Sequence, residues 1–175
     1  MKTHNLAFID LEMTGLNPEK HEIIEVGAVI TTPRLRVLEE FDFKVKPLYI
    51  ENADRVSLKV SNYNEDDWAG AQPLPEVLKI LNEKAKGCIM VGHNVAFDSL
   101  FLETAFARAG IINAMHYHKL DTVSIAWAKL HGKKNVEHFS LRELCLHFGI
   151  KNPKAHTALS DARATFELYK KLMSL

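Results

Sequence analysis

The alternation of apolar and polar positions predicts three strands in the first part of the chain, at residues 5–10, 22–32 and 35–46. The first strand is expected to be buried, because residues 7–9 form a continuous apolar triplet. The third ends in strict alternation, with apolar side chains at the odd positions of residues 41–46 and charged ones at the even positions. A period of two is typical of a half-exposed antiparallel strand, so the three strands are expected to form a meander.

From residue 75 onward the apolar period changes to that of helices. Helices are expected at residues 75–86, 95–108, 122–131, 140–148 and 157–173. The apolar run Cys88-Ile89-Met90-Val91 is typical of a strand buried on both faces, and a further short strand is expected at residues 117–120. A meander followed by strand–helix alternation predicts a mixed sheet with helices packed on it, which is an α/β fold.

Composition narrows the class of protein. The chain has 175 residues, with 47 % hydrophobic and 25 % charged residues, which is ordinary for a globular protein and excludes low-complexity fibres. No internal repeat or linker interrupts it, so a single domain over residues 1–175 is expected. No apolar run approaches the roughly 18–20 residues of a membrane span, so neither a membrane span nor a secretory leader is expected. Cys88 and Cys145 share no metal-ligand spacing, which disfavours structural zinc and disulfides and favours the cytoplasm.

Charge is balanced overall but not along the chain. The 22 basic and 22 acidic residues cancel, which argues against a protein that clamps long duplex nucleic acid. Residues 129–156 nevertheless hold six lysines or arginines and two glutamates, a local net charge of +4. This stretch is either a solvated helix face or a patch that meets an anion.

Two carboxylates follow the first predicted strand. Asp10 and Glu12 are two residues apart, so the period of a strand places both on one face of the sheet. The far ends of strands are where α/β sheets tend to bind ligands. The alternative is a pair of carboxylates that is simply exposed to water at the end of a strand.

Asp98 lies on the apolar stripe of the helix predicted at residues 95–108, for which Asn94 is a candidate N-cap. A buried carboxylate must be protonated, paired with a cation or bound to a metal. A lysine or arginine partner is the structural alternative to a metal.

Asp161 borders the apolar stripe of the last predicted helix, which Thr157 can cap. His156 then lies on the loop just outside that helix, from which its ring can approach the same site. The spacing does not single out this pair, because the chain also contains His93/Asp98 and His116/Asp121 with the same separation. We expect His93 and His116 to be ordinary hydrogen-bonding residues.

Three blocks of the sequence together resemble the DEDDh family of 3′→5′ exonucleases, in the ribonuclease-H-like superfamily. The first covers residues 8–16 and 22–27, the second is Gly92-His93-Asn94-Val95-Ala96-Phe97-Asp98, and the third covers residues 155–162. Residues 119–122 resemble a segment that this family has between its second and third motifs. The Glu-Met-Thr-Gly-Leu form of the first block is similar to oligoribonuclease, whereas the second block resembles polymerase proofreading subunits.

The resemblance implies a five-stranded mixed sheet flanked by helices, with four carboxylates converging on two divalent cations: Asp10, Glu12, Asp98 and Asp161. Mg²⁺ suits such a site of oxygen ligands, and Mn²⁺ is the expected substitute. His156 is the expected general base for two-metal-ion hydrolysis of the terminal phosphodiester, which releases nucleoside 5′-monophosphates.

The expected substrates are single-stranded DNA or RNA 3′ ends, or short oligonucleotides. Residues expected to contact the terminal nucleotide are Met13, Thr14, Gly15, Leu16, Asn94 and Phe97, although core packing is the alternative for Phe97. The sequence is compatible with a protein that acts as a monomer, as a homodimer or in association with a polymerase. The rival function is a catalytically silent module that binds nucleic-acid ends on the same fold. A non-nuclease protein that binds a small anion is a third.

Overall fold

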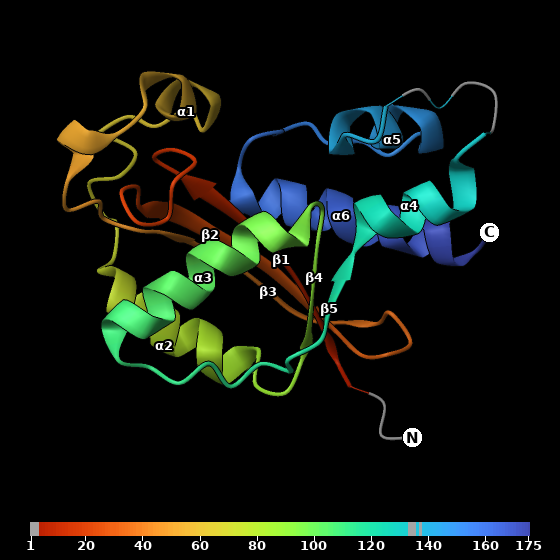
Figure 1. Ribbon diagram of the computed structural model, residues 1–175, viewed down its shortest axis with the longest axis horizontal. Helices are drawn as coiled ribbons and strands as arrows, with labels where there is room; N and C mark the ends of the chain where they lie inside the picture. The colour runs from red at the N-terminus through yellow and green to blue at the C-terminus, as the bar shows by residue number, and fades with distance from the viewer. Residues whose placement is uncertain (1–3, 133–135, 137) are drawn as a thin grey trace.

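The computed structural model describes residues 4–132, 136 and 138–175, and its centre is a five-stranded sheet in the order β3-β2-β1-β4-β5 (Figure 1). The strands are β1 (Leu6–Met13), β2 (Ile23–Thr31), β3 (Val37–Lys44), β4 (Ile89–Gly92) and β5 (Lys119–Asp121). β1, β2 and β3 pair antiparallel, whereas β4 is parallel to both β1 and β5. The predicted meander and mixed sheet are therefore confirmed.

The helices are α1 (Arg55–Val60), α2 (Leu74–Lys84), α3 (Val95–Ala109), α4 (Thr122–Leu130), α5 (Leu141–Phe148) and α6 (Ala158–Met173). A short 3₁₀ turn, η1 (Ile50–Asn52), precedes α1. Sequence periodicity predicts neither η1 nor α1, because neither contains a buried residue. The start of α1 is stabilised by its N-cap residue Asp54, whose carboxylate accepts the backbone N–H groups of Val56 and Ser57.

The two faces of the sheet carry different helices (Figure 1). Ile9 and Leu11 of β1 belong to the apolar cluster that packs against α2 and α3. Phe8 packs on the opposite face, against Phe166 and Tyr169 of α6. Because side chains alternate along a strand, every second residue after Phe8 also points toward the α6 side.

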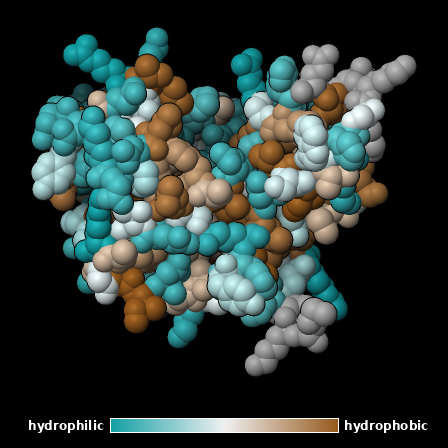
Figure 2. All heavy atoms as spheres, in the orientation of Figure 1, coloured by the Kyte–Doolittle hydropathy of each residue, from teal (hydrophilic) through white to brown (hydrophobic). Residues whose placement is uncertain are grey.

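β1 is longer than predicted. It continues to Met13, three residues beyond the expected end at residue 10, because β2 pairs with it as far as the Met13–Ile23 pair. β4 pairs with β1 only through the residues Leu6 to Phe8. The last part of β1 therefore extends past β4 with one edge free of strand pairing, in the region where Figure 2 shows the upper edge of the molecule hollowed.

Three further expectations can be compared with the structure. Cys88 and Cys145 are both free and buried, as expected. None of the helices in the described part of the chain is long and apolar enough to cross a membrane. The basic stretch is described only in part, because residues 133–135 and 137 lie outside the described residues.

Candidate active site

Asp10 and Glu12 lie in the last part of β1 on the side of the sheet that α6 covers. Carboxylate oxygens of Asp10, Glu12 and Asp161 all lie within 4.8 Å of one another. Residues from the two ends of the chain thus meet at one point. The alternative of an isolated carboxylate pair in water is wrong for this site.

Close packing of α6 on β2 brings Asp161 to β1. Asp10 pairs with Gly27 across the antiparallel ladder, and the start of α6 lies directly over that glycine. A Cβ atom on Gly27 would lie 2.1 Å from the backbone nitrogen of Leu159 and 2.2 Å from the carbonyl carbon of Ala158. Only a residue without a side chain permits this approach.

Glu25 holds the first turn of α6 in place. It is 2 % exposed, pairs with Glu12 across the ladder, and its Oε1 accepts the backbone N–H of Ala158 at 3.2 Å. Thr157 is the N-cap residue of α6, as expected, but its side chain makes no capping hydrogen bond, and its hydroxyl donates to the carbonyl of Lys154. A carboxylate from a neighbouring strand satisfies the helix N-terminus instead.

Asp98 reaches the same place from the other face of the sheet. It lies on the first turn of α3, is 6 % exposed, and its Oδ1 accepts the N–H of Leu11 at 3.1 Å. This N–H belongs to the part of β1 that extends past β4, so the carboxylate occupies the position of a missing strand neighbour. No ion pair among the described residues includes Asp98, so a lysine or arginine partner is contradicted there.

Burial, joined at two positions by neighbouring negative charges, raises the pKa of three of these carboxyl groups. Burial, followed by the charges of Asp98 and Asp161, raises the pKa of Asp10 well above its ordinary value. Burial and then Asp161 raise the pKa of Glu12 to about 8, and burial raises that of Asp98 to about 7. Hard divalent cations with oxygen ligands relieve such repulsion, so this donor set fits Mg²⁺ or Mn²⁺.

His156 lies on the loop before α6, with a left-handed backbone conformation (φ 66°). Its backbone N–H donates to Asp161 Oδ2 at 3.2 Å, and its side chain is exposed. The loop therefore holds the backbone of His156 at the carboxylate cluster and leaves its side chain accessible to solvent.

The other two histidines of the repeated spacing are hydrogen-bonding residues, as expected. His93 contacts the Thr122 hydroxyl at 3.0 Å and the Phe139 carbonyl at 2.9 Å through its two ring nitrogens. His116 Nδ1 accepts the N–H of His118 at 3.1 Å.

The turn after β1 combines buried and exposed residues. Met13 is half-buried against the core, and Thr14 is 1 % exposed, with its hydroxyl oxygen accepting the N–H of Glu22 at 2.9 Å. A Cβ atom on Gly15 would lie 2.5 Å from the ring of His21. Leu16 is 73 % exposed, so it is an apolar side chain available to a ligand.

Asn94 and Phe97 belong to the start of α3. Asn94 is the N-cap residue of α3, as expected, but its side chain makes no capping hydrogen bond. Its backbone is left-handed (φ 66°), and its N–H donates to Asp121 Oδ1 at 2.9 Å. Its side chain is exposed. The Phe97 ring is partly buried and packs edge-on against Phe101 at 5.3 Å, which favours the core-packing alternative.

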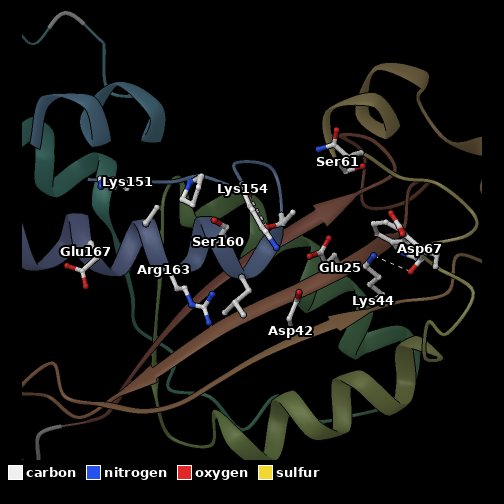
Figure 3. Close-up of a pocket in the computed structure, with 16 residues that line it drawn as sticks. Glu25, Asp42, Lys44, Ser61, Asp67, Lys151, Lys154, Ser160, Arg163 and Glu167 are labelled. Atoms are coloured by element: carbon white, nitrogen blue, oxygen red, sulfur yellow. Dashed lines mark hydrogen bonds between the residues drawn. The ribbon is translucent and has the colours of Figure 1, made fainter. Parts of the chain in front are cut away.

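Sequence reasoning missed three residues at this site: Glu25, Gly27 and Asn152. Glu25 interrupts an entirely buried strand, so a charged residue within an apolar run is a signal that could have found it. Glu25 also lines a pocket of about 760 Å³ between α6 and β3 (Figure 3). None of the four clustered carboxylates lines this pocket, which lies beside the cluster.

Comparison with known proteins places the chain in a family. The sequence model of the family described as Exonuclease matches residues 7–169. DNA polymerase III subunit epsilon of Treponema pallidum is 30 % identical over 166 residues, which cover 94 % of this chain and 74 % of that protein. DNA polymerase III PolC-type of Caldanaerobacter subterraneus is 30 % identical over 164 residues, covering 94 % of this chain but 11 % of the polymerase.

Solved structures share the fold. The zinc-bound complex of E. coli ExoI with ssDNA superposes with a TM-score of 0.82 at 19 % identity, over 99 % of this chain and 41 % of that one. The chain thus spans less than half of ExoI and about a tenth of the PolC-type polymerase. Because the family model covers most of the residues and the epsilon relative is similar along most of its own length, the chain belongs to the DEDDh family of 3′→5′ exonucleases, in the ribonuclease-H-like superfamily.

Proposed function

We propose that this chain is a metal-dependent 3′→5′ exonuclease that releases nucleoside 5′-monophosphates from single-stranded ends or short oligonucleotides. The observation that carries the proposal is the convergence of Asp10, Glu12 and Asp161 within 4.8 Å, with Asp98 bound to the backbone of the same strand. A binding module needs no such concentration of buried acids, since their repulsion destabilises the fold.

In this proposal Asp10, Glu12, Asp98 and Asp161 hold two divalent cations, with Mg²⁺ preferred and Mn²⁺ as the substitute. When bound, such cations activate water and stabilise the charge on the attacking and leaving oxygens of a phosphodiester. His156 removes the proton of the attacking water, because its backbone N–H binds Asp161 and its side chain is exposed.

The turn after β1 receives the 3′-terminal nucleotide in this proposal. Gly15 lets the His21 ring pack against the turn, and the exposed side chain of Leu16 packs against the terminal base. Met13, Thr14 and Asn94 shape this position, whereas Phe97 supports it from the core.

Single-stranded DNA is supported as a substrate by the ExoI–ssDNA complex, and polymerase association by the epsilon relative. RNA ends are the second substrate class, because the motifs resemble oligoribonuclease as well. We further propose that residues 1–175 form one exonuclease domain.

The test is hydrolysis of a 5′-labelled single-stranded oligonucleotide, with DNA and RNA of several lengths compared in Mg²⁺ and in Mn²⁺. We expect stepwise shortening from the 3′ end, release of mononucleotides, and loss of activity with a chelator. Activity that persists in the chelator would contradict the metal mechanism. Binding of 3′ ends without any product would favour the silent binding module.

Replacement of Asp98 tests the cluster directly. Asp98→Ala should abolish turnover while the protein stays folded, because a buried carboxylate without an ion-pair partner is removed. Asp98→Asn is the matched control for packing, since its amide oxygen still accepts the Leu11 N–H. The folding of each variant is measured by circular dichroism, and its turnover by the nuclease assay. If both variants unfold, Asp98 is a structural residue.

A further inference from the structure

We propose that Asn152 is a positioning residue for the reaction, and that together with Ser160 it fixes the carboxylate of Asp161 and the loop that carries His156. The proposal rests on the proposed function and adds to it two residues outside the four carboxylates and the histidine.

The geometry is a chain of hydrogen bonds across the start of α6. The Ser160 hydroxyl donates to Asn152 Oδ1 at 2.6 Å, and the Asn152 amide Nδ2 donates to Asp161 Oδ1. The backbone N–H of His156 donates to the other oxygen, Asp161 Oδ2. Both oxygens of one carboxylate are therefore held by donors from the single loop that precedes α6. Figure 3 shows Ser160 near the start of that helix.

Asn152 anchors the part of the loop that is next to His156. Ile150 and Thr157, at the two ends of the loop between α5 and α6, are half-buried as well, but within residues 151–156 every residue except Asn152 is exposed. Asn152 is half-buried, and both ends of its amide contact α6. The position of residues 151–156 against the cluster therefore depends in part on this side chain.

An amide is suited to this position by its charge. A lysine or arginine next to Asp161 would neutralise the carboxylate and compete with a divalent cation. The amide of Asn152 orients the carboxylate while leaving its negative charge in place, because the amide donates a hydrogen bond and does not ionise. Hydrogen-bond partners of metal-ligating carboxylates typically contribute about 10–100-fold to metal affinity or activity.

The same contacts hold His156. Only three residues separate it from Asn152, so an anchor at Asn152 restricts where the imidazole can go. Loss of the anchor should therefore act on cation binding through Asp161 and on turnover through His156.

The experiment compares Asn152→Ala, Ser160→Ala and Ser160→Thr with the wild-type chain. Mn²⁺ affinity is measured by electron paramagnetic resonance without substrate, and kcat and KM are measured on a single-stranded oligonucleotide. We expect Asn152→Ala to weaken Mn²⁺ binding and to lower kcat, each by about 10–100-fold, with little change in KM. Ser160→Ala should shift both values in the same direction by less, and Ser160→Thr, which keeps the hydroxyl, should behave as wild type.

A double variant tests whether the two residues act together. If Ser160 acts only through Asn152, Asn152→Ala/Ser160→Ala should be no worse than Asn152→Ala alone. Wild-type Mn²⁺ affinity and kcat in a folded Asn152→Ala variant would overturn the proposal. Should Asn152→Ala fail to fold, equal values for Ser160→Ala and Ser160→Thr would overturn it. A wild-type chain that releases no mononucleotides would contradict the proposed function instead.

Discussion

His93 and His156 differ in what their rings contact. The Thr122 hydroxyl lies 3.0 Å from His93 Nδ1 and 3.1 Å from the carbonyl of Gly92, but its one proton can serve only one of them. If the hydroxyl donates to Nδ1, a neutral His93 donates from Nε2 to the Phe139 carbonyl, and all of these contacts are satisfied except the one to Gly92. Burial lowers the pKa of His93, which agrees with a neutral ring. His156 has an exposed ring.

Replacing His156 should therefore affect catalysis and not stability. We expect His156→Ala to lower kcat by about 10²–10⁴-fold, because a general base is lost, and to leave the melting temperature almost unchanged. His93→Ala is the control and should mainly lower the melting temperature. A silent His156→Ala together with an inactive but stable His93→Ala would assign the base to His93.

The sequence predicts some residues of the site and not others for a physical reason. Asp98 is predictable because a helical period places it on an apolar stripe, so its burial follows from local geometry. Asn152 has no such pattern, since its position depends on a loop that folds back onto α6. Asn94 and Thr157 are the N-cap residues of α3 and α6, as expected, but neither side chain makes a capping hydrogen bond. Acidic residues from elsewhere in the fold accept N–H groups at these helix starts: Asp121 that of Asn94, and Glu25 that of Ala158.

The contact between α6 and β2 decides whether the two ends of the chain form one site. Gly27 pairs with Asp10 in the sheet, and the α6 backbone lies closer to it than any side chain would allow. Apolar periodicity predicts β2 and α6 themselves, but it does not predict that their backbones come so close. It depends on one glycine in an otherwise bulky strand, whose conformation is ordinary extended backbone.

Gly27→Ala should lift α6 from the sheet. The added methyl group would meet backbone atoms of Ala158 and Leu159, which cannot rotate away, so we expect the free energy of unfolding to fall by about 1–3 kcal/mol or more. Mn²⁺ affinity should fall with it, because Asp161 moves away from Asp10 and Glu12. Urea unfolding and Mn²⁺ titration measure the two effects. Gly70→Ala is the matched control, since no atom lies within 4 Å of its added Cβ. Equal stability of the two variants would show that α6 can shift without cost.

At the scale of the whole molecule, a net charge of zero conceals a concentration of acid. Folding gathers Asp10, Glu12, Asp98 and Asp161 at one end of β1. Glu25 adds a fifth carboxyl beside them, and its pKa is raised to about 7 by burial and by the neighbouring Asp42. The unfolded chain has none of this crowding, so the cost of ionising these groups belongs to the folded state.

The stability of the metal-free protein should therefore fall as pH rises. The pKa values of Glu12 (about 8), Asp98 (about 7) and Glu25 (about 7) all lie above the ordinary range of carboxyl groups near 4. Between those limits the folded state binds more protons than the unfolded state, so the free energy of unfolding decreases with pH. In a chelator, we expect the melting temperature to fall between pH 6.5 and pH 8.5, a window above most of the histidine titration.

Divalent cations should reverse this trend, because they bind the ionised carboxylates of the folded state. Added Mg²⁺ or Mn²⁺ should raise the melting temperature more at pH 8.5 than at pH 6.5. Asp10→Asn provides the matched control: with one charge fewer, its metal-free form should be more stable than wild type at pH 8.5 and should gain less from Mg²⁺. The metal site is inferred from carboxyl groups that are crowded together in the folded protein. If the melting temperature of the wild-type protein in chelator rises between pH 6.5 and pH 8.5, that crowding is contradicted.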